Sequence, residues 1–588
     1  MTHDSIRRQI ITISFVLLLA FPVQIVFGKG SGFVFCPPEE VEDVVSEMQH
    51  EAGEEELPFD ALEMDVKSRE PLFLTGKAAR DDVERLFYLL ENGYSGYGYF
   101  EQAGDFQVAK ENILSDLDGK VILRGSELSG IIHEHLGFLH DCHLSIGDHG
   151  YGEHHDFWFD EEYELEKDDQ GYFIEHDGEA RAIISINGED PDGFVFLSLS
   201  PDGDEIFHLG LLSPQPPDPL EVVLSDLEEP IQVELVTSGH EYGKLFSDTV
   251  VGGVPVVRIG SFSDHHKEYI DQFLASASKY KDEPCLIVDI RGNGGGNTMY
   301  ARQWVTSSTG VNPGSIQVFT ELVSETSMMG RANYLSYLLD NYPDLEDQGY
   351  PQKIDRFMGT AEQIETGESE AHWSPYNVPT AKEIPSNRTL IVLIDSNVGS
   401  AAEGFLCYLQ QMDNVVLVGE NSGGAVIYGQ MTMHLLPNSR LQVRLPITLN
   451  IFTDLVYREE RGFYPDYWVP AGEAVNYAVA AVRSGIIPTT ESYVDQVSSV
   501  KFVHQISPKK SIGVLDVFPY VLFLFYGGVF VVVNRKRDWK FFLVCSVLGA
   551  FVWLYISVRN PSLKPVFLLA WVEYLLIALY KRWKDLTN

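Results

Sequence analysis

Ser400 stands at a position where a hydroxyl could act as a nucleophile. An apolar run, Leu390 to Ile394, predicts a strand, and a short polar turn, 395–399, separates it from an amphipathic run, Ala401 to Met412, that predicts a helix. The serine therefore lies at a sharp strand-to-helix corner, near free main-chain N–H groups that can hold an anion. Serine is also a favoured helix N-cap, so the residue alone does not decide between the two roles.

A loop of glycines follows a second predicted strand. The strand, Leu286 to Ile290, carries Asp289 and runs through Arg291 into the sequence Gly292-Asn293-Gly294-Gly295-Gly296. Consecutive glycines allow positive φ angles and let the main chain approach a bound group closely. A nucleotide phosphate is not favoured as that group, because the Lys-Ser/Thr of the Walker pattern and the spacing of the dinucleotide fingerprint are both absent.

Histidines are concentrated upstream of these two stretches. Seven of them lie between His133 and His155, both included. Histidine is a common metal ligand, but the spacings follow no closed zinc pattern and no CxxC pair assists. We expect one imidazole with a function and the others on the surface, and we predict neither a metal site nor another cofactor.

The elements around these residues predict an α/β fold. Residues 250–309 read as strand, helix, strand, glycine loop and helix, which is the pattern of a crotonase- or ClpP-like core. Four stretches then occur in the order typical of one family: VPVVRIGSF (254–262), IVDIRGNGGG (287–296), GSAAE (399–403) and VVLVGENSGG (415–424). Over roughly Ala79 to Ala481 the chain resembles peptidase family S41, the C-terminal processing and tricorn-like serine proteases.

This resemblance implies a role for each residue of the two stretches. Ser400 matches the family's nucleophile, and the main-chain N–H groups of Gly295, Gly296 and Ala401 would form the oxyanion hole. Glu403 could favour the first helical turn through the helix dipole, which is a structural role.

The general base separates two branches of the family. The processing proteases use a Lys after G-E-x-x-x-G, where this chain has Ala425, and alanine cannot accept a proton. The tricorn-like branch uses a His that follows N-terminal helices, and His143 matches that place. Its orienting Glu precedes the closing Gly-x-x-Pro-Asp, here Gly462 to Asp466, so Glu459 matches it.

One position departs from the tricorn-like pattern. Cys142 occupies the place of the Ser that relays to the base, and a thiol is a weaker hydrogen-bond partner than a hydroxyl. Asp141 could orient His143 instead. Glu459 and its neighbour Glu460 could also be a charged pair on the surface.

The sequence divides into seven predicted parts. They are a signal peptide or signal anchor (1–28), an acidic linker (29–78), an N-terminal helical part of the peptidase (79–150), a β-rich, degenerate PDZ-like module (151–240), the S41 core (241–485) with an insertion at 310–385, a linker (486–513), and three transmembrane helices with a short cytoplasmic tail (514–588).

Composition limits the partners of the chain. With 86 acidic and 42 basic residues the formal net charge is −44, so nucleic acid is an unfavourable partner. Five cysteines are scattered without the pattern of a disulfide framework. The oligomeric state does not follow from the sequence.

Apolar runs at both ends predict a membrane protein. A basic pair precedes the first run, residues 10–27, and the last three run over about 514–533, 541–558 and 565–580. Basic clusters at 535–537 and 581–584 would lie inside the cell by the positive-inside rule. The catalytic part would then lie outside the cytoplasm, at the cell membrane.

These features together predict a membrane-anchored extracytoplasmic serine peptidase. It would hydrolyse peptides or proteins through an acyl-enzyme, with Ser400 as nucleophile and His143 as base. Two alternatives remain: a non-catalytic ligand- or peptide-binding protein on the same fold, and a histidine-rich metalloenzyme.

Overall fold

The computed structural model of the chain describes residues 35–52, 61–64, 71–104, 106–169, 171–239, 242–379, 384–386 and 388–489. The chain divides into two compact units, 1–499 and 500–588, and every described residue belongs to the first. The predicted signal segment and the three predicted membrane spans lie outside the described residues. Within the described ranges, none of the helices is both long and apolar enough to cross a bilayer.

A six-stranded sheet forms the core of the peptidase, with the strand order β13-β14-β15-β18-β19-β24. The strands are β13 (Phe246–Val251), β14 (Val254–Ile259), β15 (Cys285–Asp289), β18 (Thr389–Ile394), β19 (Val415–Gly419) and β24 (Tyr467–Trp468). All pairs from β14 to β24 are parallel, and only β13 runs antiparallel to its neighbour. Every residue of β14, β15 and β18 is buried, as expected when helices cover both faces of a parallel sheet.

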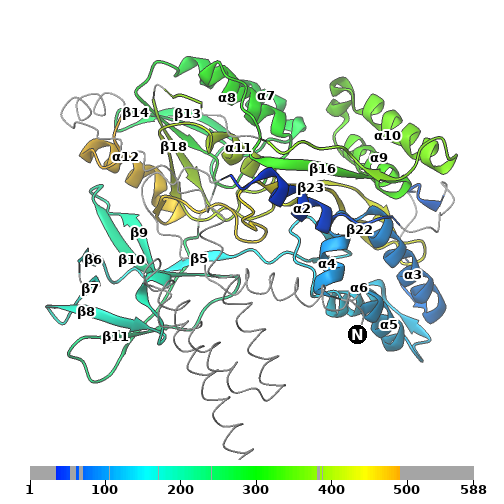
Figure 1. The fold of residues 1–588 in the computed structure, drawn as a ribbon, viewed down its shortest axis with the longest axis horizontal. Helices are drawn as coiled ribbons and strands as arrows, with labels where there is room; N and C mark the ends of the chain where they lie inside the picture. The colour runs from blue at the N-terminus through cyan, green and yellow to red at the C-terminus, as the bar shows by residue number, and fades with distance from the viewer. Residues whose placement is uncertain are drawn as a thin grey trace, which may run out of the picture. The chain divides into compact units, whose positions relative to one another are not determined.

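Neighbouring side chains of one strand point to opposite faces of this sheet. Leu390 and Val392 of β18 pack toward α7 (Lys267–Lys279), α8 (Thr298–Thr309) and α11 (Ala401–Leu409). Ile391 and Leu393 pack toward α12 (Ala474–Ser484) on the other face. Figure 1 shows these two layers of helices on either side of the strands. The α/β core predicted from the sequence is therefore present.

The predicted insertion contributes to the fold's interior. It supplies β16 (Gln317–Val323), α9 (Glu325–Asn341), α10 (Tyr350–Glu365) and β17 (His372–Trp373). β16 pairs with β23 (Pro446–Phe452) in a second sheet of order β17-β16-β23-β20, where β20 is Tyr428–Met431. Residues 310–385 are thus part of the folded core, because one of their strands completes a sheet with the chain beyond Ser400.

The N-terminal part is helical where the sequence pattern predicts it. Its helices are α3 (Gly76–Gly93), α4 (Tyr97–Ala103), α5 (Phe106–Asp116) and α6 (Gly125–His135), and a two-stranded sheet pairs β1 (Leu74–Thr75) with β2 (Ile122–Leu123). The predicted acidic linker includes a helix. Residues 38–48 form α2 (Pro38–Met48), which buries Val41, Val45 and Met48 because these apolar residues share one helical face.

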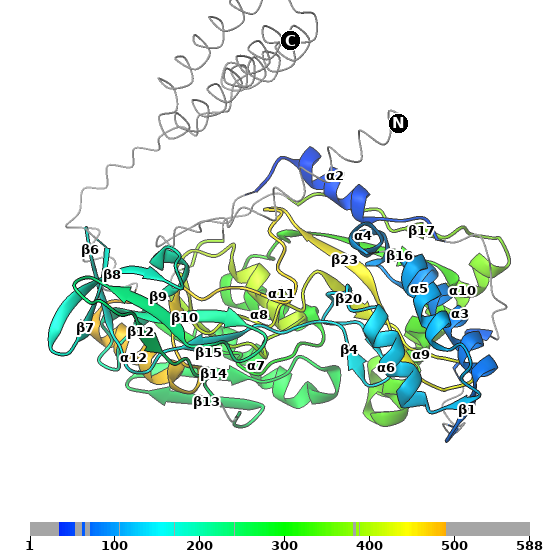
Figure 2. The same ribbon diagram turned by 90° about the horizontal axis from the view of Figure 1, so that it is seen from below.

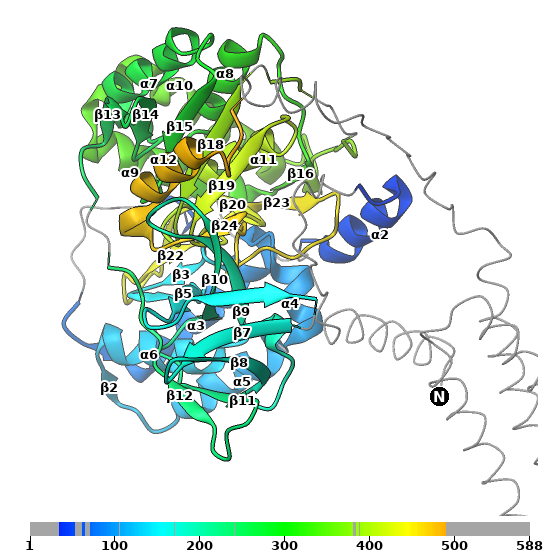
Figure 3. The ribbon, with the colours of Figure 1, turned by 90° about the vertical axis from the view of Figure 1, so that its left-hand side faces the viewer.

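The segment between 156 and 233 forms a separate β-rich module. Its sheet has the order β12-β11-β8-β7-β6-β10-β5, with β9 paired to β10. The strands are β5 (Asp156–Phe159), β6 (Leu165–Asp168), β7 (Gly171–His176), β8 (Glu179–Ile186), β9 (Val195–Leu199), β10 (Glu205–Ser213), β11 (Leu220–Leu224) and β12 (Ile231–Val233). In the described part of the module, the only helical element is the 3-10 turn η2 (Pro191–Gly193). Figure 2 shows this module and the N-terminal helices at opposite ends of the core, and in the view of Figure 3 the module stands in front of those helices. Its likeness to a PDZ domain stays a prediction.

A small sheet joins the N-terminal helices to the core. Its order is β21-β22-β3-β4, made of β21 (His434–Leu435), β22 (Gln442–Arg444), β3 (Ser145–Ile146) and β4 (His149–Gly150). Ser145 of β3 pairs with Arg444, and Ile146 pairs with Val443. Through this register, the chain just after His143 is attached to a segment about 300 residues downstream.

Candidate active site

Ser400 occupies a strained corner between β18 and α11. Its φ is 52° and its ψ is −119°, a conformation that residues with a side chain rarely adopt. Such strain costs about 1–3 kcal/mol and persists only where the surroundings hold it. Two contacts do so here, because the Ser400 N–H donates to the Ala425 carbonyl at 3.0 Å and to Glu403 Oε2 at 3.1 Å.

The structure brings His143 to this corner. His143 Nε2 lies 3.3 Å from Ser400 Oγ, although the two residues are 257 positions apart in the chain. This separation is slightly longer than the 2.6–3.2 Å typical of a nucleophile and its base, and such contacts are often longer before substrate binds. The two residues that the sequence predicts as nucleophile and base therefore meet.

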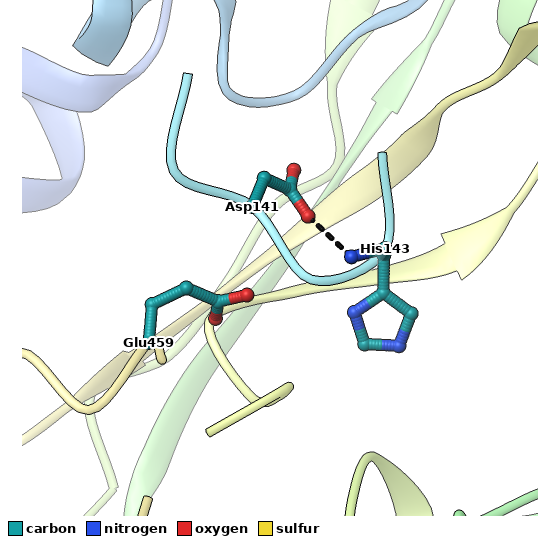
Figure 4. Close-up of side chains that lie close together, drawn as sticks. All are labelled: Asp141, His143 and Glu459. Atoms are coloured by element: carbon teal, nitrogen blue, oxygen red, sulfur yellow. Dashed lines mark hydrogen bonds between the residues drawn. The ribbon is translucent and has the colours of Figure 1, made fainter. Parts of the chain in front are cut away.

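A tight turn holds the main chain of His143. Asp141 Oδ1 accepts the His143 N–H at 2.7 Å and the Leu144 N–H at 3.2 Å. Tyr94, which ends α3, donates its hydroxyl to Asp141 Oδ2 at 2.9 Å. Figure 4 shows the Asp141 carboxylate directed at this main-chain N–H, with the imidazole pointing away from it. Asp141 therefore orients the backbone of the base rather than its ring.

Burial keeps His143 neutral. The pKa of His143 is lowered to about 4, first by burial and then by the nearby charge of His154. At neutral pH the imidazole is thus unprotonated and able to accept a proton. Its Nδ1 is enclosed and has no hydrogen-bond partner among the described residues.

Glu459 is buried beside the base, so it does not belong to a charged surface pair. Its carboxylate accepts the N–H groups of Cys142 (3.0 Å), Val426 (3.2 Å) and Ile427 (2.8 Å). Burial, and then the charge of Asp141, raise the pKa of Glu459 well above its usual value. One possible ligand atom from each of Asp141, His143 and Glu459 lies within 4.8 Å of the other two. Figure 4 shows these three side chains near one another. No direct hydrogen bond from Glu459 to the imidazole is among the described contacts.

Glu460, the neighbour of Glu459, has a different environment. Its Oε1 accepts the Glu153 N–H at 2.8 Å and lies 3.1 Å from His140 Nδ1. These contacts fasten the segment after β4 to the segment that carries Glu459. Glu460 does not approach the nucleophile through any described contact.

Cys142 takes part through its main chain. Its N–H is the group that donates to Glu459, and its thiol packs closely against Gly152. Burial, and then the charge of Glu459, raise the pKa of the Cys142 thiol, so it stays protonated. No hydrogen bond between this thiol and His143 is among the described contacts, and the relay implied by the family pattern has no counterpart here.

The glycine loop lies directly against the nucleophile. A side chain on Gly295 would approach both the Ala401 nitrogen and Ser400 Cβ to 2.8 Å, and the φ of Gly295 is +103°. One predicted donor needs correction: the Gly295 N–H donates to Asn293 Oδ1 at 3.0 Å and is therefore already engaged. Gly296 and Ala401 remain as the predicted oxyanion donors.

Glu403 is a buried acid that is hydrogen-bonded to the main chain of Ser400. It is fully buried, and it accepts hydrogen bonds from Ser400 N–H, from Ser422 Oγ at 2.6 Å and from Gly424 N–H at 2.9 Å. Burial raises the pKa of Glu403 to about 7, whereas these hydrogen bonds favour the ionised form.

Several residues of the site carried little signal in the sequence. Tyr94 lies outside the motifs, whereas Asn293 and Ser422 lie inside two of them, at positions to which the sequence assigned no role. Glu403 did carry a signal, since an acid three residues after a helix N-cap is the spacing of a capping box. Only the hydrogen bond from Ser400 follows that pattern, because Ser422 and Gly424 come from another loop.

The histidines of the 133–155 segment do not converge on one point. His133 stacks on His149 at 4.4 Å, His135 pairs with Asp116, His140 with Glu460, and His154 bonds to the Gly423 carbonyl. Among the described residues, the one group with metal-binding spacing is Asp141, His143 and Glu459. Its carboxylate oxygens already accept main-chain N–H groups or a tyrosine hydroxyl.

The sequence motifs agree with a known family of peptidases. Residues 253–469 match the model of peptidase family S41. This chain carries an S41 serine peptidase domain. The match includes the glycine loop, Ser400 and Glu459, while His143 lies upstream of it.

Three of the solved structures with similarity to the chain are the following. Mature CPAF shares 14% identity with a TM-score of 0.38, over 72% of this chain and 97% of that one. The photosystem II D1 C-terminal processing protease shares 14% sequence identity with a TM-score of 0.32, over 69% of this chain and 99% of that one. The tricorn protease shares 12% sequence identity with a TM-score of 0.30, over 70% of this chain and 37% of that one. A comparison with curated proteins finds no match.

Proposed function

We propose that this S41 peptidase cleaves peptides or proteins with Ser400 as its nucleophile and His143 as its general base. The observation that carries the proposal is the 3.3 Å contact between His143 Nε2 and Ser400 Oγ. The family's lysine base has no counterpart, because Ala425 stands in its place and cannot accept a proton. An imidazole at the nucleophile supplies the missing base.

The geometry allows a complete acyl-transfer cycle. Ser400 Oγ bonds to the scissile carbonyl carbon as its proton passes to His143 Nε2, and the carbonyl electron pair moves to oxygen. The N–H groups of Gly296 and Ala401 stabilise that oxyanion, each worth about 10²–10³ in rate. The imidazolium then protonates the departing amine. Water, deprotonated by the same imidazole, attacks the acyl carbon, and the imidazolium returns its proton to Ser400 Oγ as the carboxylic acid product leaves.

Glu459 would stabilise the imidazolium that forms during this cycle. Burial raises the pKa of Glu459 and favours its neutral form, but a positive charge on His143 within 4.8 Å favours the ionised carboxylate, which in turn favours the imidazolium. The three N–H donors on its carboxylate hold it in place and favour its ionised form. Its role is electrostatic, since no described hydrogen bond joins it to the ring.

We further propose that the chain is anchored in the cell membrane with this domain outside the cytoplasm. The support is the sequence: apolar runs over 10–27 and, after residue 513, over three further segments with basic flanks. These segments lie outside the described residues.

A fluorophosphonate probe tests the catalytic proposal on the purified full chain. Such probes react with an activated serine, so we expect labelling and peptide hydrolysis that are both lost in Ser400→Ala. Folded wild-type protein that neither reacts with the probe nor cleaves a peptide library would favour a binding protein on the same fold. Hydrolysis that a chelator abolishes and Ser400→Ala does not would favour a metalloenzyme.

A further inference from the structure

Glu403 lies where three segments of the active site meet. It belongs to the first turn of α11, three residues after Ser400, and its side chain is fully buried. One carboxylate oxygen accepts the Ser400 N–H at 3.1 Å. The other accepts the Gly424 N–H at 2.9 Å and the Ser422 hydroxyl at 2.6 Å.

Ser422 extends this contact to the segment that bears Glu459. Its Oγ accepts the Phe463 N–H at 2.7 Å, so its own hydrogen is free to point at Glu403. The two segments touch closely, since a side chain on Gly462 would approach Ser422 Oγ to 2.2 Å. Glu403 is therefore linked through one hydroxyl to the segment that begins at Glu459.

The partners of Glu403 are all donors, which suits an ionised carboxylate. Hydrogen bonds to a charged acceptor are roughly twice as strong as neutral ones, and inside a protein they are little screened. Ser400 needs such support, because its φ of 52° is strained and its N–H must face inward for its hydroxyl to face His143.

We infer that Glu403 is a positioning residue, which holds Ser400 in its strained conformation and ties the nucleophile to the segment carrying Glu459. This inference rests on the proposed function, in which Ser400 is the nucleophile. Glu403 does not touch the reacting atoms, and it acts through the Ser400 N–H and through Ser422.

Glu420 offers a matched control. It lies at the end of β19, is 5% exposed, and accepts hydrogen bonds from Ser238 Oγ and from the Ala471 N–H at 2.7 Å. Burial raises its pKa to about 7, as it does for Glu403. Glu420 makes no described contact with Ser400, so Glu420→Gln removes a comparable buried charge without touching the nucleophile.

The test compares Glu403→Gln, Ser422→Ala and Glu420→Gln in the full chain. For Glu403→Gln we expect kcat and the rate of fluorophosphonate labelling to fall by about 100-fold with KM unchanged, because a small displacement of a reacting group costs that much. Ser422→Ala should lower kcat about 10-fold, and the double variant should lose less than the product of the two, since both act on one network. Glu420→Gln should keep the wild-type kcat, whatever its effect on the thermal midpoint.

Two results would overturn the inference. One is a kcat within twofold of wild type in both folded Glu403→Gln and folded Ser422→Ala. The other is an equal loss in Glu420→Gln, which would show a general effect of removing a buried charge. If Glu403→Gln does not fold, Ser422→Ala alone decides. Failure of the proposed function looks different, because wild type itself would then show no Ser400-dependent labelling.

Discussion

Two substitutions relative to the family pattern meet at the proposed catalytic residues of this protein. Ala425 removes the lysine base of the processing branch, and Cys142 replaces the relay serine of the tricorn-like branch. The structure places His143 at the nucleophile and uses only the main chain of Cys142. The base is thus held by its backbone, through Asp141, and by burial, rather than by a side-chain relay.

Replacing His143 tests the base directly. In His143→Gln the amide cannot accept the Ser400 proton, so we expect kcat to fall by about 10²–10⁴-fold, the usual contribution of a general base. The matched control is His140→Gln, which changes an imidazole that pairs with Glu460 instead of Ser400. Peptide hydrolysis at pH 7 measures both. Equal rates for His143→Gln and wild type would remove His143 from the mechanism.

Among the secondary-structure elements, the glycine loop packs closely against the start of α11. Gly295 faces Ser400 and Ala401 so closely that no side chain fits, whereas a side chain on Gly294 would meet nothing within 4 Å. Two adjacent glycines therefore differ in what they do, although the sequence does not distinguish them.

The pair of glycines gives a controlled experiment. We expect Gly295→Ala to lower kcat by at least about 100-fold, because its Cβ would displace the oxyanion donors, each worth about 10²–10³. Gly294→Ala should stay within about twofold of wild type, as open sites tolerate a methyl group. Kinetics with one peptide substrate compare the two variants. A larger loss in Gly294→Ala than in Gly295→Ala would contradict this account of the loop.

His434 on β21 has no part in the proposed mechanism, but its burial affects stability. The residue is buried against Gly330 of α9, and neither ring nitrogen has a protein partner among the described residues. Burial, and then the charge of Arg85, lower its pKa to about 3. Below pH 6.5 the unfolded chain binds a proton here that the folded chain does not, so this site costs stability as pH falls from 6.5 toward 3.

His434→Leu should remove that pH dependence. The unfolding free energy of the variant relative to wild type should rise by about 1.4 kcal/mol per pH unit as the pH is lowered from 6 to 4. Chemical denaturation at several pH values measures this difference, and acid effects elsewhere in the chain cancel because both proteins share them. Parallel curves for the two proteins would show that His434 is protonated in the fold.

At the scale of the whole molecule, charge and the predicted membrane segments set the environment. The formal net charge of −44 favours solubility and disfavours nucleic acid. The apolar runs at both ends of the chain predict a catalytic domain held at a membrane surface. Substrates would then meet it outside the cytoplasm.

Membrane fractionation checks that arrangement. We expect the full chain to stay in the membrane pellet after alkaline carbonate, because several apolar spans would hold it there. A tag after Asn588 should resist protease added to intact cells, while the S41 domain should be accessible. Release by carbonate would contradict the anchor, and digestion of the tag would contradict the predicted orientation.

Much of the fold followed from local patterns. Buried strands around Asp289 and before Ser400, helical periodicity in 79–150, and the corner at Ser400 all depend on neighbouring residues, so the sequence predicted them. The burial of α2 and the strand within 310–385 were not predicted. Both depend on distant partners, since α2 needs a surface to cover and β16 needs β23.

Local patterns in the chain predicted which groups could react: a serine at a strand-to-helix corner, a loop of glycines, an imidazole upstream, and no lysine where the family has one. The folded chain was needed to learn which of seven histidines meets the serine, that the Gly295 N–H is engaged, and that Glu403 reaches Ser422. These two kinds of feature depend on residues at different distances along the chain. A residue's type and local conformation depend on near neighbours, whereas a contact across 257 residues depends on how the small sheet of β3 and β22 joins two distant parts of the chain.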